Sequence, residues 1–141
     1  MELWDIYDSD KKRTGRTMKR NDWCLKDGEY HLTVLGVITR PDGKYLITKR
    51  VMTKAWAPGW WEVSGGAAQA GEASYDAVLR EVKEETGLTL TSYKLRGLVT
   101  FISDKCEPEL MCVFTANEYI GELTECNEGE LYWIDKVVVP T

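Results

Sequence analysis

The segment from Ser64 to Gly87 constrains the fold of this 141-residue chain more than any other part of its sequence. It begins with a Ser-Gly-Gly turn, which predicts a sharp change of chain direction. Residues 73–86 then place apolar side chains at the i, i+3, i+4 and i+7 positions of a helix, namely Tyr75, Val78, Leu79 and Val82. Gly87 follows directly, and glycine is the residue type that most often ends a helix. We therefore predict a helix over residues 73–86, entered through a glycine-rich loop.

Strand signals surround this segment on both sides. Runs rich in β-branched and aromatic residues predict strands over residues 30–39, 44–49, 60–63, 93–103, 110–119 and 130–134. The Pro41-Asp42-Gly43 turn predicts that the first two form a hairpin. The charged segment Asp8–Arg20 predicts a surface turn or a short hairpin. One helix among several strands, without a linker or repeat, predicts one mixed α/β domain over residues 1–141.

The charge balance argues against two classes of partner. The chain has 18 Lys and Arg against 23 Asp and Glu, so its formal net charge is −5, whereas a nucleic-acid binder shows a dense basic face. No apolar run approaches the ~18 residues of a membrane span, and the first residues do not form a signal peptide. The four cysteines form no Cys-x-x-Cys pair, which argues against a zinc or redox motif and favours a cytoplasmic setting.

Three glutamates gather on one side of the predicted helix. Glu81, Glu84 and Glu85 fall within an arc of about 100°, away from the apolar stripe. Arg80, four residues before Glu84, offsets their mutual repulsion only in part. Three convergent carboxylates suit Mg2+ or Mn2+, because both ions prefer oxygen ligands. A solvated helix face would show the same pattern, and the glycine-rich turn before the helix is what favours a metal–phosphate site.

The spacing of these residues resembles that of a known family. Gly66, five residues, Glu72, seven residues and then residues 80–88 (REVKEETGL) match every fixed position of the Nudix box, G-x5-E-x7-R-E-U-x-E-E-x-G-U with U aliphatic. The resemblance implies an α/β/α sandwich with a mixed sheet, in which the box forms a loop, a helix and a second loop. It also implies Mg2+-dependent hydrolysis of a diphosphate linked to another moiety. Residues 66–88 are called the box below.

The resemblance assigns roles to the acidic residues of the box. It implies that Glu81, Glu84 and Glu85 bind the metal ion, with the backbone carbonyl of Gly65 as a further ligand. Glu81 is also the candidate base that activates water, although the residues do not decide which glutamate fills this role. Arg80 would orient Glu81, and Glu84 completes the predicted catalytic set.

Three further residues are assigned supporting roles by the same resemblance. Glu72 would tie the loop to the helix through its carboxylate. Gly66 and Gly87 would support the turns at the two ends of the box, where a side chain would obstruct the chain.

The chain outside the box resembles the isopentenyl-diphosphate isomerase-like branch of the family. The resemblance rests on Tyr30-His31-Leu32, Thr48-Lys49-Arg50, Pro58-Gly59-Trp60-Trp61 and Glu107-Pro108-Glu109. True isomerases carry a catalytic Cys and a metal-binding His in the loop before the helix, where this chain has Gly65-Gly66-Ala67. We therefore expect a hydrolase on an isomerase-like body, without isomerase chemistry.

Each candidate residue outside the box allows two interpretations, one as a functional residue and one as an ordinary structural or surface residue. Glu107 and Glu109 match a metal-binding pair of the isomerases, but a solvated acidic loop would have the same composition. Arg50 and Lys54 match phosphate-contacting positions of that branch, and they are equally ordinary as surface charges after a strand. His31 opens an apolar strand, so we expect a structural histidine rather than a metal ligand.

The leading hypothesis is a Mg2+-dependent hydrolase that cleaves a pyrophosphate bond in a nucleoside diphosphate derivative or a related small diphosphate. The alternatives are a non-catalytic module that binds nucleotide diphosphates and, less favoured, an isopentenyl-diphosphate isomerase. Residues 135–141 show no helix signal, so we expect the second helical layer of the sandwich to be short or absent. An uncovered apolar sheet face favours a homodimer.

Overall fold

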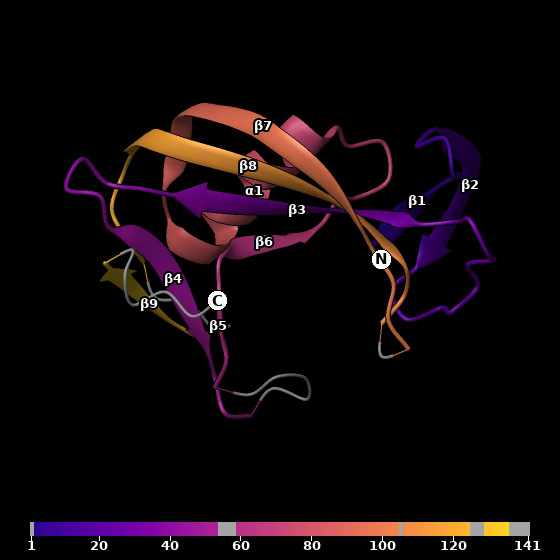
Figure 1. Ribbon diagram of the computed structural model, residues 1–141, viewed down its shortest axis with the longest axis horizontal. Coiled ribbons are helices and arrows are strands. Elements are labelled where there is room, and N and C mark those ends of the chain that lie inside the picture. Colours follow the sequence, from indigo (N-terminus) through magenta and orange to yellow (C-terminus); the bar gives the residue numbers. More distant parts are fainter. Residues whose placement is uncertain (1, 54–58, 105, 125–128, 136–141) are drawn as a thin grey trace.

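Figure 1 shows the computed structural model, which describes residues 2–53, 59–104, 106–124 and 129–135. Within these ranges the elements are β1 Leu3–Tyr7, β2 Arg13–Lys19, β3 His31–Ile38, β4 Tyr45–Arg50, β5 Trp61–Glu62, β6 Ser64–Ala67, α1 Ser74–Thr86, β7 Thr89–Phe101, β8 Glu109–Ile120 and β9 Gly129–Ile134. The predicted mixed α/β fold is confirmed.

The strands form three sheets. The largest has the order β6-β3-β8-β7, a smaller one has the order β5-β4-β9, and β1 and β2 form a hairpin of their own. β3 and β8 are parallel, with His31 opposite Glu109, and the other strand pairs are antiparallel. Parallel pairing therefore brings the first residues of β3 and β8, which lie far apart in the sequence, to the same end of the sheet.

The helix α1 packs on one face of the four-stranded sheet, behind β3 and β8 in Figure 1. Alternate residues of β3 and β8 face it and form half of the main core cluster, including Leu32, Val34, Ile38, Leu110, Cys112 and Phe114. A Cβ atom at Gly36 would lie 3.1 Å from Val82 Cγ2 and 3.2 Å from Val78 Cγ2. The helix axis therefore approaches β3 most closely at Gly36, where no side chain intervenes.

The apolar stripe predicted for the helix is correct at its centre and wrong at its start. Val78 and Val82 are fully buried, as are Ala77 and Thr86, whereas Tyr75 is 45% exposed. The close approach of α1 to the sheet leaves room for the small side chain of Ala77 but not for a tyrosine ring. Tyr75 instead lies at the rim, where its ring meets the edge of Phe114 with 4.9 Å between centroids.

The predicted hairpin of residues 30–39 and 44–49 is also wrong beyond its turn. Arg40 N–H donates to Lys44 O at 2.9 Å, and Thr39 and Tyr45 form one isolated bridge. β4 then leaves β3 and pairs with β5 and β9. The reason is that β3 already pairs with β6 on one edge and β8 on the other, so it has no free edge for β4.

The sheet face opposite α1 remains partly open. Val99 is 49% exposed and Phe101 is 41% exposed on β7, the edge strand of the sheet. α1 is the only helix in the described ranges, so they contain no second helical layer over this face. No helix in those ranges is long and apolar enough to cross a membrane.

A pair of glycine substitutions separates backbone strain from packing at the end of α1. Gly87 and Gly43 both have φ +84°, but a Cβ at Gly87 would lie 2.7 Å from Glu122 O, whereas a Cβ at Gly43 meets nothing within 4 Å. We expect Gly43→Ala to cost ~1 kcal/mol of unfolding free energy for the left-handed backbone. Gly87→Ala should cost ~1–3 kcal/mol more for the clash. Urea denaturation measures both, and equal losses would show that the packing around Gly87 is unimportant.

Candidate active site

The glycine turn and the helix meet at Gly66. This residue lies in β6, opposite Val34 of β3, and a Cβ atom there would be 2.6 Å from Glu81 Cδ and 2.7 Å from each carboxylate oxygen. No other residue type fits without displacing Glu81. The local sequence therefore places the backbone of the glycine turn directly against the first glutamate of the box.

Arg80 is the centre of the polar contacts in the box. Its Nε and Nη2 donate to the two carboxylate oxygens of Glu72 at 2.8 and 2.9 Å. Its Nη1 donates to Glu81 Oε1 at 3.0 Å and to Glu84 Oε2 at 3.2 Å. Nη2 also donates to the carbonyl of Ala67 at 3.2 Å. One guanidinium thus joins the loop carboxylate, two helix carboxylates and the loop backbone.

These contacts and burial shift the acidic groups in opposite directions. Hydrogen bonding from Arg80 lowers the pKa of Glu72. Burial raises the pKa of Glu81, although the nearby Arg80 charge opposes this shift. Burial, and then the negative charge of Glu81, raises the pKa of Glu85 to about 8, against a hydrogen bond from the Gly65 backbone. Glu81 and Glu85 therefore lie close enough to repel each other.

The carboxylates of the box are not arranged as a metal-binding cluster in this structure. In the described ranges no group of three or more His, Cys, Asp or Glu side chains is arranged to hold a metal ion. Glu84 is 61% exposed and bonded to Arg80, while Glu85 lies toward Gly65. The donors nevertheless fit a hard divalent cation, because they are carboxylate oxygens, and burial together with the charge of Glu81 raises the pKa of Glu85.

Glu107 and Glu109 have separate environments. Glu107 is buried, its Oε1 accepts the Trp23 N–H at 2.7 Å, and burial raises its pKa. Glu109 opens β8 with Oε1 3.7 Å from His31 Nε2, and burial raises its pKa. The contacts described for the pair include none to a glutamate of the box.

His31 has the environment of a structural histidine. Its ring stacks on Trp4 with 4.2 Å between centroids and 8° between planes. Burial lowers its pKa to about 4, so the ring is neutral at neutral pH. This agrees with the structural role expected from the sequence.

The structure describes one of the two predicted phosphate-contacting residues. Arg50 Nη1 donates to Glu62 Oε1 at 3.0 Å and to Oε2 at 3.2 Å, so a carboxylate already accompanies this cation. Lys54 lies outside the described residues. Glu62 is absent from the residues singled out by sequence, yet its charge also raises the pKa of Glu85.

Comparison with known proteins decides the family. The sequence matches the NUDIX domain over residues 29–139. The chain belongs to the NUDIX domain family. It is 34% identical over 111 residues to the uncharacterized Nudix hydrolase YvcI of Bacillus subtilis, covering 75% of this chain and 67% of that protein. Two Nudix hydrolases from Listeria species are matched over only 60% and 53% of their own length.

Two further comparisons extend the likeness. The oxidized purine nucleoside triphosphate hydrolase of Danio rerio is 33% identical over 111 residues, covering 77% of this chain and 69% of that protein. The crystal structure of a MutT NUDIX hydrolase from Burkholderia pseudomallei is 30% identical with a TM-score of 0.69, covering 78% of this chain and 86% of that one. The shared architecture agrees with the mixed α/β fold described above.

Residues before the matched NUDIX range also reach the box loop. Asp5 Oδ2 accepts the Gly71 N–H at 2.7 Å, and Arg13 Nη2 donates to the Glu72 carbonyl at 3.2 Å. Neither residue was found from the sequence, because contacts between positions about 60 residues apart leave no local pattern. They become visible only in the structure, where the N-terminal hairpin lies against the loop.

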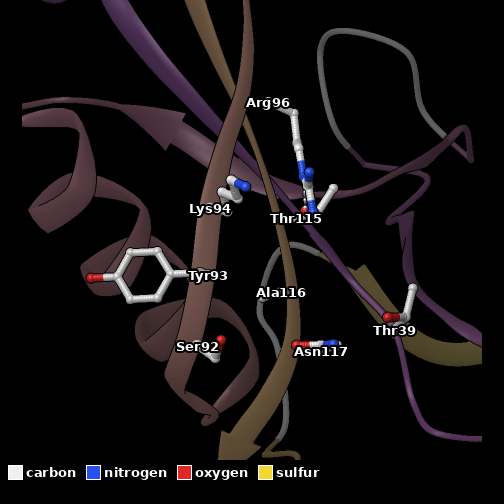
Figure 2. Close-up of a pocket in the computed structure, with 8 residues that line it drawn as sticks. All are labelled: Thr39, Ser92, Tyr93, Lys94, Arg96, Thr115, Ala116 and Asn117. Atoms are coloured by element: carbon white, nitrogen blue, oxygen red, sulfur yellow. Dashed lines mark hydrogen bonds between the residues drawn. The ribbon is translucent and has the colours of Figure 1, made fainter.

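A separate hollow of about 490 Å³ lies where β7, β8 and the end of β3 meet (Figure 2). Its lining includes Lys94, Arg96, Thr115 and Asn117, and Arg96 Nε donates to Thr115 Oγ1 at 2.8 Å. No residue of the Nudix box lines it. The hollow is therefore separate from the candidate active site.

The pKa of His31 predicts a pH-dependent stability. The unfolded histidine titrates near 6.5 and the folded one at about 4, so the unfolded state binds more protons between these values. Stability should fall as the pH drops from about 6.5 to about 4, by on the order of 3 kcal/mol from this residue. Urea denaturation of the metal-free protein at pH 7 and pH 4.5 measures the loss. His31→Phe should reduce it, and an unchanged pH dependence in this variant would contradict the assignment.

Proposed function

We propose that the chain is a Mg2+-dependent Nudix pyrophosphohydrolase, acting as one domain on a nucleoside diphosphate derivative or a related small diphosphate. The observation that carries the proposal is the Arg80 network. A single guanidinium bonds Glu72, Glu81 and Glu84, and Glu85 lies half-buried on the same helix. A solvated helix face would not require a partly buried arginine bonded to three carboxylates and a backbone carbonyl.

The metal would be held by oxygen ligands of the box and its surroundings. Glu81, Glu84 and Glu85 are the proposed carboxylate ligands, with the Gly65 carbonyl and either Glu109 or Glu107 completing the set. When bound, Mg2+ (or Mn2+) supplies charge neutralisation and Lewis-acid activation at the diphosphate.

Glu81 is the proposed base, and Arg80 is its orienting partner. Arg80 Nη1 bonds Oε1 of Glu81, and the described contacts include no hydrogen bond to Oε2. That second oxygen is therefore open to accept a proton from an attacking water. Burial raises the pKa of Glu81, and the charge of Arg80 opposes this shift and so favours the ionised form that this role requires.

The substrate class is drawn from the family and from the chemistry of the site. The Danio rerio relative, an oxidized purine nucleoside triphosphate hydrolase, adds nucleoside triphosphates to the candidate substrates. Arg50 and Lys54 remain proposed phosphate contacts, and Arg50 would have to exchange Glu62 for the substrate. A −5 protein with several glutamates at one site needs a cation between itself and a diphosphate.

Membership of the isopentenyl-diphosphate isomerase-like branch is part of the proposal, without the isomerase reaction. Gly65-Gly66-Ala67 supplies neither the thiol nor the imidazole of a true isomerase. Gly65, which stands where the isomerases carry the cysteine, has no room for a side chain in this fold, because a Cβ there would lie 2.1 Å from the Val34 carbonyl oxygen. Incubation with isopentenyl diphosphate in D2O should show no proton exchange.

Neutralising Glu81 tests the catalytic assignment. Glu81→Gln should lower kcat by about 10²-fold or more, because it removes a metal ligand and the proposed base. Asp76→Asn is the matched control, since Asp76 is exposed on the same helix at one of the unspecified positions of the box, between Glu72 and Arg80. The activity of both variants is measured with Mg2+ on a substrate identified by screening diphosphate compounds, and circular dichroism checks the fold. Near-full activity of Glu81→Gln would overturn the assignment.

A substrate panel separates the hydrolase from a non-catalytic binding module. Phosphate or pyrophosphate release is followed for dinucleotides, nucleotide sugars, nucleoside di- and triphosphates and prenyl diphosphates, with Mg2+ and with EDTA. The proposal expects turnover of at least one compound with Mg2+ and none with EDTA. Metal-dependent binding without turnover across the panel would instead establish the binding module.

We also propose that a second copy of the chain covers the open sheet face opposite α1, at its β7 edge. Val99, Phe101 and Ile102 are 49%, 41% and 69% exposed along one edge strand and its end, where the backbone has no further strand partner in the described ranges. Such an edge favours self-association. Light scattering at micromolar concentration should give twice the mass of one chain. Ile102→Lys should lower the measured mass toward that of a single chain. A single-chain mass for the parent protein would refute the dimer.

A further inference from the structure

The N-terminal hairpin of β1 and β2 holds the loop that opens α1. This hairpin lies outside residues 29–139, the range that matches the NUDIX domain, and stands at the end of the sheet where β3 begins (Figure 1). Ala70 N–H donates to the carbonyl of Leu3 at 2.7 Å. The next amide, Gly71 N–H, donates to Asp5 Oδ2 at 2.7 Å. Two consecutive loop amides are therefore bound by one strand of the hairpin.

Arg13 extends this attachment to the following residue. Its Nε lies 3.2 Å from Asp5 Oδ2, and its Nη2 donates to the carbonyl of Glu72 at 3.2 Å. Asp5 and Arg13 thus hold the N–H of Gly71 and the C=O of Glu72, which belong to two adjacent residues of the loop. The Asp5 side chain is only 15% exposed, so water competes weakly for its carboxylate.

The hairpin that carries Asp5 is itself firmly packed. Trp4, Ile6 and Met18 are buried and form a cluster with Ala67 of β6. Tyr7 and Tyr30 exchange backbone hydrogen bonds of 2.7 and 2.9 Å, which join β1 to the residue before β3. Asp5 is therefore presented to the loop from an ordered strand on a buried apolar base.

The held loop residue is also the one that orients the catalytic arginine. Glu72 is fixed through its backbone carbonyl by Arg13 and bonds Arg80 through both carboxylate oxygens. Arg80 in turn bonds Glu81. A displacement of the loop at Gly71 and Glu72 would therefore be transmitted to the guanidinium and to the proposed base.

We propose that Asp5 is a positioning residue of the active site, which acts by holding the Gly71–Glu72 segment in the place that Arg80 and Glu81 require. This inference rests on the proposed function for its effect on catalysis. Its structural part, the attachment of the loop by Asp5, is independent of any activity. Within the described residues, Asp5 contacts none that is assigned to the metal or the substrate, so its effect should fall on turnover rather than on substrate binding.

Two substitutions at Asp5 and one control test the inference. Asp5→Ala removes the acceptor for Gly71 N–H, whereas Asp5→Asn keeps a side-chain oxygen in the same place. Asp10→Ala is the control, because Asp10 is an exposed aspartate of the same hairpin whose carboxylate forms no hydrogen bond or ion pair within the described ranges. All measurements are made on the full chain, well below the thermal transition of each variant.

The first readout is hydrogen exchange and needs no substrate. In metal-free protein, the Gly71 amide should exchange about five- to tenfold faster in Asp5→Ala, the effect of losing one hydrogen bond. Asp5→Asn and Asp10→Ala should stay close to the parent. Unchanged protection in Asp5→Ala, or equal loss in the asparagine variant, would overturn the attachment even if the enzyme proves inactive.

The second readout is steady-state kinetics with Mg2+ on the substrate identified by the panel. Asp5→Ala should lower kcat by about 10- to 100-fold with KM within about twofold, and Asp5→Asn should recover most of kcat. Faster exchange at Gly71 without a change in kcat would show a merely structural hairpin and refute the positioning role. An inactive parent protein would instead refute the proposed function, while the exchange result still decides the attachment.

Discussion

The active-site architecture depends on one guanidinium group. Arg80 forms five hydrogen bonds, to both oxygens of Glu72, to Glu81, to Glu84 and to the Ala67 carbonyl. Arginine suits this place because its planar fork offers several donors at fixed angles and it keeps its charge in any environment. A lysine could meet one carboxylate as a point charge but could not hold the loop and the helix at once. The cation thus sets the spacing of the acidic residues before any metal binds.

The central strand β3 imposes a second constraint on the same site. β8 pairs with one edge of β3 and β6 with the other. This pairing places Gly65 opposite Leu35 and Gly66 opposite Val34. The glycines are needed there, since a Cβ at Gly65 would lie 2.1 Å from the Val34 carbonyl. The same occupied edges send β4 into another sheet and carry Arg50 to Glu62. Sheet topology therefore fixes both the position of the glycine turn and the partner of a proposed phosphate contact.

The acidic groups of the site remain only partly compensated by protein. Glu72 is stabilised as a carboxylate by Arg80, which lowers its pKa, while burial raises the pKa of Glu81, Glu85 and Glu109. A fold that buries carboxylates without matching cations stores electrostatic free energy that a bound cation would release. The proposed metal dependence follows from this imbalance. The hairpin adds order from outside the matched NUDIX range, through Asp5 and the packed base beneath it.

The sequence by itself determined the local features of this protein. The end of α1 at Gly87, the mixed α/β class and the box that identifies the family all depend on residues close together in the chain, where spacing translates directly into geometry. The tertiary structure alone decided which strands pair, that Tyr75 lies at the rim, that Glu107 is bonded to Trp23 and that Asp5 reaches Gly71. These are contacts across 60 or more residues or choices between sheet edges. They follow from the packing of whole elements, which competes with and overrides the local pattern that a sequence displays.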